Sequence, residues 1–148
     1  GTPGASSSRD RGKGCSEEIA KHPGSKVVAK QTANFDRSKA LDVTTNLMQA
    51  HSKATGIFAE NDEMAIGAIS ALGSKAGQSA KVVGFDGTAD GIKAVKAGTM
   101  GATIAQQPAL LGKTAVDQAA DILAGKQVSK TTPIKVVLVT KDNAKDYE

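Results

Sequence analysis

Short apolar runs and amphipathic stretches alternate along this chain of 148 residues. The apolar runs are rich in Val, Ile and Ala, and they occupy residues 26–31, 55–59, 81–85, 101–105 and 134–139. Runs of this length and composition are typical of strands that a parallel sheet buries on both faces. The pattern therefore predicts five strands.

Stretches with helical spacing separate several of these runs. Residues 36–51, 62–72 and 108–124 each place apolar side chains three and four positions apart, which makes one apolar face on a helix. Asn61 or Asp62 is placed to cap the second of these helices. Because strands and helices alternate, we expect a doubly wound α/β fold, in which a parallel sheet carries helices on both faces.

The start of the chain departs from this alternation. The residues GTPG form a glycine-rich loop that leads into a helical stretch, with no strand ahead of it. In a strand–helix–strand unit such a loop connects a strand to its helix. We therefore expect a lobe that is truncated at its N-terminus and lacks its first strand. An exposed, flexible terminus is the alternative explanation.

Polar and aromatic side chains follow the predicted strands, at the edge where open α/β sheets bind their ligands. Together with an arginine in the opening helix they supply a guanidinium, two amides, a carboxylate and two aromatic rings. Carboxylates, amides and guanidinium groups suit a ligand with many hydroxyls. The sequence thus predicts a sugar pocket. Its residues are Arg11, Phe35, Asn61, Phe85, Asp86 and Gln106.

Each of these residues also has an ordinary structural explanation. At the ends of strands, Asn61 and Asp86 would serve as helix caps. Phe35 and Phe85 would be core residues, and Gln106 would belong to a turn. Taken singly these explanations are the stronger ones, so the prediction of a binding site depends on the residues converging on one edge.

Composition narrows the function classes. The net charge of +4 comes from dispersed lysines, without the concentrated basic face of a nucleic-acid binder. No apolar run approaches the roughly 20 residues of a membrane span, and the polar N-terminus carries no signal peptide. The lone Cys15 excludes an intramolecular disulfide and a cysteine-based metal cluster. Neither a catalytic constellation nor a phosphate-binding loop is present, so we expect no enzyme, no metal and no cofactor.

Five segments resemble the periplasmic ribose-binding proteins, which are sugar-binding components of ABC transporters with a LacI-like fold. They are GTPGASSSRDRGKG, NFDRSKAL, FAENDEMAIGAISAL, VVGFDGTADGIKAVKAGTMGATIAQQP and TPIKVVLV. The resemblance implies sugar contacts for the six residues above, since each stands in a family motif. One position departs from the pattern, because Cys15 stands where the family usually has an aromatic residue.

The resemblance also implies a division of the chain. Residues 1–107 would form the C-terminal sugar-binding lobe, 108–135 a crossover helix and strand of the N-terminal lobe, and 136–148 the return strand and C-terminal tail. The helix over 108–124 would then lack its natural partner. We expect its exposed apolar face to favour dimerisation or association with the missing lobe.

The function that the resemblance implies is binding for import. The protein would be an exported solute-binding component, periplasmic or anchored outside the membrane, that closes two lobes around ribose or a related monosaccharide and docks on an ABC transporter permease. Two alternatives stay open. One is the sugar-responsive effector domain of a LacI-type transcription regulator, and the other is a fragment with no binding activity alone.

Overall fold

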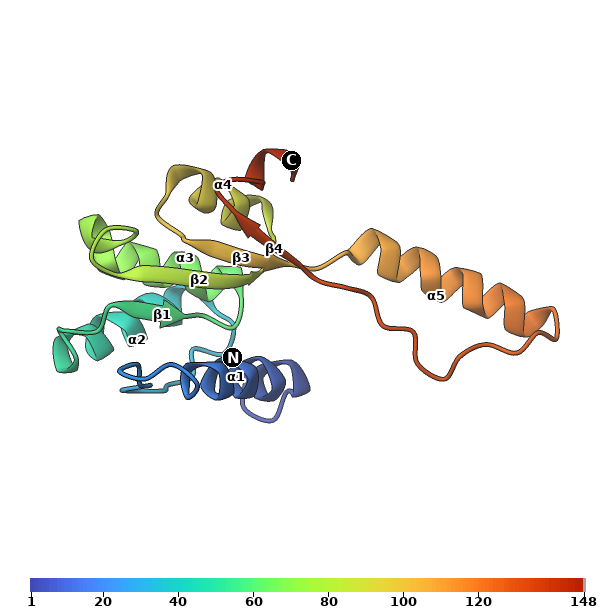
Figure 1. The fold of residues 1–148 in the computed structure, drawn as a ribbon, viewed down its shortest axis with the longest axis horizontal. Coiled ribbons are helices and arrows are strands. Elements are labelled where there is room, and N and C mark those ends of the chain that lie inside the picture. Colours follow the sequence, from blue (N-terminus) through green and yellow to red (C-terminus); the bar gives the residue numbers. More distant parts are fainter. Residues whose placement is uncertain (148) are drawn as a thin grey trace.

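The computed structural model describes residues 1–147, and Glu148, the end of the expected C-terminal tail, lies outside the described residues. Helices and strands alternate over most of the described chain (Figure 1). The elements are α1 (Ser6–Ile19), α2 (Arg37–Ala50), β1 (Gly56–Phe58), α3 (Asp62–Leu72), β2 (Lys81–Asp86), α4 (Ala89–Ala97), β3 (Ala102–Ala105), α5 (Pro108–Leu123) and β4 (Val137–Thr140).

The strands form one sheet in the order β1-β2-β3-β4. The pairs β1–β2 and β2–β3 are parallel, which confirms the expected α/β class. The expectation of a wholly parallel sheet is wrong at β4, which pairs antiparallel with β3 and sets Val137 opposite Ala105. The reason is the path of the chain. It leaves the carboxyl end of β3, runs out along α5 and returns to that same end, so β4 must run in the opposite direction.

Small apolar side chains fill the space between the sheet and helices α3 and α4, and α2 packs against α3. Ala65, Val82, Val95 and Met100 are almost completely buried there. Helices α2 and α3 cross so closely that a Cβ atom on Gly67 would lie 2.2 Å from the carbonyl oxygen of Arg37. Only glycine permits this crossing, which brings α3 and the strand end before it into a fixed position.

The first predicted strand is wrong. Residues 26–31 run extended but belong to no strand, and no backbone–backbone hydrogen bond within the described chain involves residues 26–32. A cleft of about 920 Å³ is lined both by this segment and by β1. The segment therefore has the conformation of a strand, but it has no neighbouring backbone to pair with.

Helix α5 and the residues that follow it form an arm that projects away from the sheet (Figure 1). Several apolar side chains on this arm are exposed, including Leu111, Val116, Ile122 and Leu123. Between α5 and β4 the described chain forms no strand. A helix both long enough and apolar enough to cross a bilayer is not found among the described residues.

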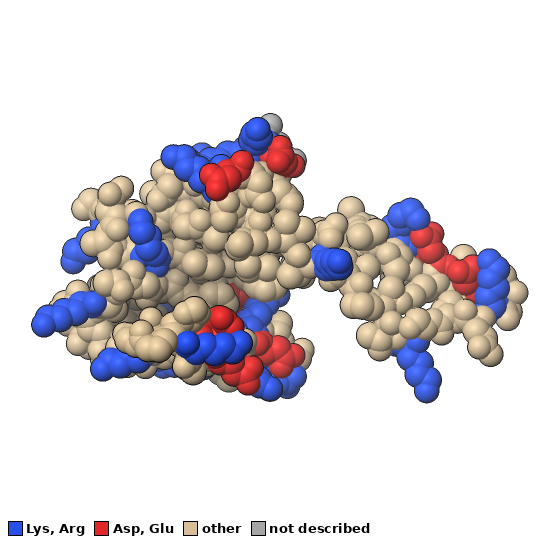
Figure 2. All heavy atoms as spheres, viewed as in Figure 1, with Lys and Arg blue, Asp and Glu red and all other residues tan. Residues whose placement is uncertain are grey.

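Charged side chains are spread over the molecule. On the face shown in Figure 2, Lys and Arg side chains alternate with Asp and Glu side chains on both the body and the arm. Many of these charges form exposed ion pairs, such as Lys113–Asp117 on α5. Pairs of this kind contribute little to stability. Because charges of both signs are interspersed on this face, the positive net charge does not gather into one field there.

Candidate functional site

The carboxyl ends of the parallel strands lie at one edge of the sheet, as the sequence predicts. Asn61 follows β1, Asp86 is the last residue of β2, and Gln106 follows β3. The register sets Asp86 opposite Ala105, and the backbone N–H of Gln106 donates to the backbone oxygen of Asp86 at 3.1 Å. Side chains from separate turns therefore converge on this edge.

Asp86 is the centre of the cluster. The side-chain amide of Gln106 donates to Asp86 Oδ1 at 2.7 Å, and Arg11 Nη1 lies 3.6 Å from the same oxygen. The Arg11 guanidinium also lies over the Phe85 ring, 3.8 Å from its centroid. These four residues form one continuous set of contacts. Within the described chain no group hydrogen-bonds the second oxygen of Asp86, Oδ2, which leaves it available to an external donor.

The backbone and the carboxyl group of Asp86 are both perturbed. Its φ of +118° lies in a region that residues with side chains rarely adopt, and such strain costs on the order of 1–3 kcal/mol. Burial raises the pKa of the Asp86 carboxyl, while the hydrogen bond from Gln106 and the charge of Arg11 lower it and the charge of Asp62 raises it. Strained backbone and a half-buried acid are typical of functional sites.

Asn61 has a structural role at this edge. Its Oδ1 accepts from the backbone N–H of Met64 at 2.9 Å, so it is the N-cap of α3, and its Nδ2 donates to the backbone oxygen of Phe35 at 3.3 Å. The residue is 8% exposed. Asn61 therefore fixes the turn at Phe35, a turn in which Phe35 itself has a φ of +59°.

Arg11 is held in place from a separate helix. Besides its contacts with Phe85 and Asp86, its Nη1 donates to the backbone oxygen of Glu60 at 2.7 Å. This bond ties α1 to the end of β1, next to Asn61. The six predicted residues therefore lie at one edge, with Arg11, Phe85, Asp86 and Gln106 in direct contact and Phe35 joined to Asn61.

Sequence reasoning missed the residue that holds this edge together. Asp62 is fully buried and accepts hydrogen bonds from the backbone N–H of Thr88 at 2.8 Å, the Thr88 hydroxyl at 3.0 Å and the Thr103 hydroxyl at 2.7 Å. The sequence offered Asp62 only as a candidate cap. Its partners are 26 and 41 residues away, so no local pattern could have pointed to them.

The arrangement suits binding better than catalysis. Asp86 and Gln106 accept and donate hydrogen bonds, Arg11 donates, and Phe85 presents an apolar ring. A glycosidase needs two carboxyl groups that flank the bond to be broken. The acids on either side of Asn61 are both engaged within the chain: Asp62 accepts three internal hydrogen bonds, and Glu60 accepts from the Ser8 hydroxyl and contacts the amino group of Gly1. Within the described chain no group of three or more His, Cys, Asp or Glu could hold a metal ion.

Comparison with known proteins decides the family. The periplasmic binding protein domain matches residues 1–127. The chain belongs to this family. The resemblance found in the sequence motifs is thereby confirmed at the level of the family, and the structure agrees with it in fold.

Members of the family with curated names are close in sequence. The chain is 45% identical to the ribose import binding protein RbsB of Haemophilus influenzae and 47% identical to that of Bacillus subtilis, in each case over 95% of its length. The matches cover 48% and 45% of those two proteins. The chain therefore spans about half the length of the curated relatives that it matches.

Solved structures of the family superpose closely on this chain. An ABC transporter solute-binding protein of Actinobacillus succinogenes with bound D-allose gives a TM-score of 0.95 at 35% identity, over 99% of this chain and 53% of that protein. A Caulobacter myo-inositol binding protein with bound myo-inositol gives a TM-score of 0.88 at 37% identity, over 97% of this chain and 50% of that protein.

Proposed function

We propose that the chain carries one lobe of a solute-binding component of an ABC sugar importer, and that its ligand is ribose or a close relative. The observation that carries this proposal is the cluster of Arg11, Phe85, Asp86 and Gln106 at the carboxyl edge of the sheet. It brings a carboxylate, a guanidinium, an amide and an aromatic ring together where open α/β sheets bind ligands.

Each side chain has a defined part in the proposed site. Gln106 holds one oxygen of Asp86, so the other is positioned to accept from a sugar hydroxyl. Arg11 covers one face of the Phe85 ring, which leaves the opposite face or the ring edge for the C–H groups of the sugar. Asn61 contributes at most one amide hydrogen, because its oxygen caps α3 and its other amide hydrogen is donated to the backbone oxygen of Phe35. Phe35 forms the second apolar wall.

The proposed binding mode needs more than this edge. We place the sugar-binding lobe in residues 1–107, a crossover segment of the other lobe in 108–135, and the return strand and tail in 136–148. A second lobe closing over the sugar would bury it, and the closed form would dock on a membrane permease in the periplasm or outside the cell. The sugar favours closure only through its greater affinity for the closed state. No chemical step is part of this proposal.

The names of the relatives support a monosaccharide or cyclitol as ligand. Two curated relatives are named for ribose import, and two structural neighbours hold D-allose and myo-inositol. Identity to the two ribose import proteins is higher than to the two structural neighbours, which favours ribose among these ligands.

The test is saturation-transfer NMR of the chain with ribose, allose and myo-inositol, a method that detects weak binding to half of a site. We expect the strongest signal from ribose and its loss in Asp86→Asn, which keeps the shape of the side chain but removes its charge. Asp117→Asn is the matched control, since Asp117 lies exposed on α5, where it pairs with Lys113. Equal signals in the two variants, or no signal with any of the three ligands, would refute the proposed site.

A further inference from the structure

The turn that carries Asp86 is held from the interior by two side chains, Asp62 of α3 and Thr103 of β3, which are both fully buried. The Thr103 hydroxyl accepts from the backbone N–H of Gly87 at 3.2 Å, and Asp62 Oδ2 accepts from the backbone N–H of Thr88 at 2.8 Å. The two N–H groups that directly follow Asp86 in the chain are therefore each bound by a side chain from another element.

The two buried side chains act as one unit. The Thr103 hydroxyl donates to Asp62 Oδ1 at 2.7 Å while it accepts from Gly87. A hydroxyl has a single proton and rotates to suit its acceptor. Asp62 therefore fixes the orientation in which the Thr103 hydroxyl offers a lone pair to Gly87, and it binds Thr88 at the same time.

The Asp62 carboxyl is closely fitted into its place. A Cβ atom on Gly84 of β2 would lie 2.3 Å from Asp62 Oδ1, and a Cβ atom on Gly91 of α4 would lie 2.1 Å from Oδ2. Two glycines on neighbouring elements thus provide the room that this carboxyl occupies. Its position relative to β2, and so to the turn after β2, is set by contact on both sides.

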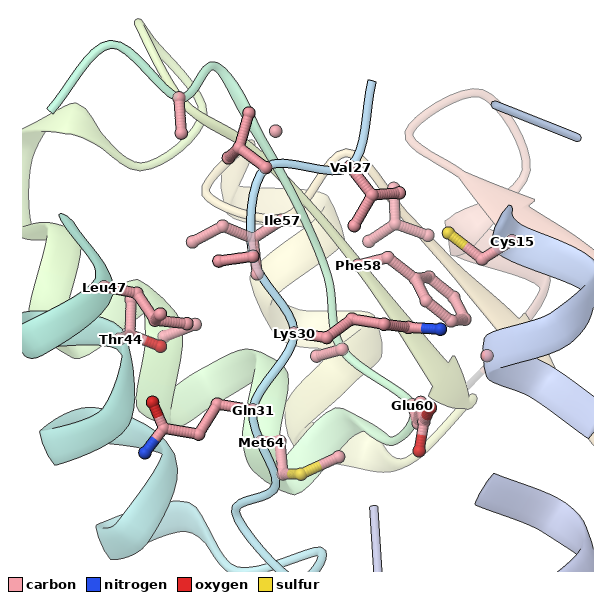
Figure 3. A pocket seen from close by; sticks show the side chains of 18 of the residues that line it. Cys15, Val27, Lys30, Gln31, Thr44, Leu47, Ile57, Phe58, Glu60 and Met64 are labelled. Atoms are coloured by element: carbon pink, nitrogen blue, oxygen red, sulfur yellow. The ribbon is translucent and has the colours of Figure 1, made fainter. Parts of the chain in front are cut away.

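Helix α3 presents other side chains to the cleft beside β1. Met64 lines that cleft (Figure 3), whereas neither Asp62 nor Thr103 lines it. The hydrogen bonds of Asp62 and Thr103 lie instead beneath the edge where Asp86 stands. Loss of either side chain should therefore act on the Asp86 turn and not on the cleft.

The backbone of Asp86 needs support of this kind. Its φ is +118°, which residues with side chains rarely adopt, and the φ of Gly87 is +71°. Strained backbone persists only where the surrounding structure over-determines it. The hydrogen bonds from Gly87 and Thr88 fix the two peptide groups on the carboxyl side of Asp86, so they supply such a constraint.

We propose that Asp62 and Thr103 are positioning residues of the sugar site, which hold the turn of Asp86, Gly87 and Thr88 in the conformation that binds the ligand. Both are fully buried, so neither touches the sugar. The inference rests on the proposed function, because it assigns how the affinity of that same site is set. A turn released from these contacts occupies its binding conformation for only part of the time, and the apparent affinity falls by that fraction.

Two substitutions of Thr103 separate positioning from packing. Thr103→Val keeps the shape of the side chain and removes the hydroxyl, whereas Thr103→Ser keeps the hydroxyl and removes a methyl group. We expect Thr103→Val to weaken ribose binding by about tenfold or more and Thr103→Ser to leave it nearly unchanged. Titration of the ¹⁵N-labelled chain with ribose measures both affinities.

The backbone of Asp86 provides a readout that needs no sugar. The three-bond coupling between the amide and α protons of a residue is small at a φ of +118° and large in ordinary extended backbone. The coupling at Asp86 should rise in Thr103→Val and stay small in Thr103→Ser. This measurement decides the positioning role in the free chain, whereas a chain that binds no ribose would refute the proposed function alone.

Variants elsewhere control for a general loss of stability. Val95→Ala shortens a fully buried side chain near the C-terminal end of α4, so it should destabilise the fold without weakening ribose binding or changing the Asp86 coupling. Circular dichroism verifies that each variant is folded. A coupling at Asp86 that stays small in Thr103→Val, or an equal loss of ribose affinity in Thr103→Val and Val95→Ala, overturns the proposal.

A second pair of variants tests the same unit through Asp62. Asp62→Ala removes the acceptor of the Thr88 N–H and should raise the Asp86 coupling, as Thr103→Val does. Asp62→Asn keeps one acceptor for Thr88 and should keep the coupling small and most of the ribose affinity. The same Asp86 coupling in Asp62→Ala as in the unaltered chain would also overturn the proposal.

Discussion

Replacing Asp62 tests whether one buried carboxylate holds the binding edge together. In Asp62→Ala three hydrogen bonds disappear, two from Thr88 and one from Thr103. Hydrogen bonds to a charged group contribute about 1.5–3 kcal/mol each. The hydroxyls of Thr88 and Thr103 still accept from the backbone N–H groups of Gly91 and Gly87. The largest loss is therefore the hydrogen bond from the backbone N–H of Thr88, which is left without an acceptor.

The magnitude follows from these contacts. Removing a buried charge recovers part of its desolvation cost, so the sum is smaller than three full hydrogen bonds. We expect Asp62→Ala to lower the free energy of unfolding by about 3–5 kcal/mol. Asp62→Asn should cost less, because it keeps one acceptor for Thr88 and its amide can donate to a rotated Thr103 hydroxyl.

Urea denaturation followed by circular dichroism measures the effect. Asp117→Ala is the matched control, and since it removes only an exposed ion pair its stability should change by less than about 1 kcal/mol. An Asp62→Ala variant as stable as Asp117→Ala would refute the reasoning that Asp62 joins α3, β3 and the turn after β2.

Two further predictions follow from the site and the core. Gly67→Ala should destabilise the fold by about 1–3 kcal/mol, because the added Cβ meets the Arg37 carbonyl. Gly112→Ala on α5 is the control and should not destabilise the fold, because its added Cβ meets open space. Melting temperatures that move in the same direction for both variants would contradict this prediction. Because burial raises the pKa of Asp86, its folded carboxyl binds protons more tightly than the unfolded one. The contribution of Asp86 to the free energy of unfolding should therefore improve as the pH falls through that raised pKa. Ribose binding should be lost over the same pH range and kept above it, which NMR titration at neutral and acid pH checks. Ribose binding that is unchanged at acid pH would count against Asp86 as a sugar-binding residue.

The alternation of apolar runs and helical stretches was enough to predict the α/β class and the edge that gathers the candidate residues. Parallel strands end at one edge whatever their exact bounds, so Asn61, Asp86 and Gln106 could be placed together from order alone. The direction of β4 could not be predicted, because it depends on where the arm of α5 returns to the sheet.

The remaining errors and omissions arise from long-range contacts. Residues 26–31 have the composition of a strand, but a strand needs a paired neighbour, and the pattern along the chain does not show whether one is present. Asp62 was passed over because its partners come from distant turns. The sequence around Asn61 is compatible with a helix cap and with a sugar contact, and the coordinates show that its oxygen caps α3.

Mapping ribose onto the ¹⁵N-labelled chain by backbone amide shifts tests the proposed sugar site most directly. If Asp86 and its neighbours bind the sugar, the largest shifts will occur at residues 11, 85–87 and 106, with little change at residues 27–31 and 56–58 around the cleft. Largest shifts in the cleft, or no shifts at saturating ribose, would contradict a sugar site at the carboxyl edge of the sheet.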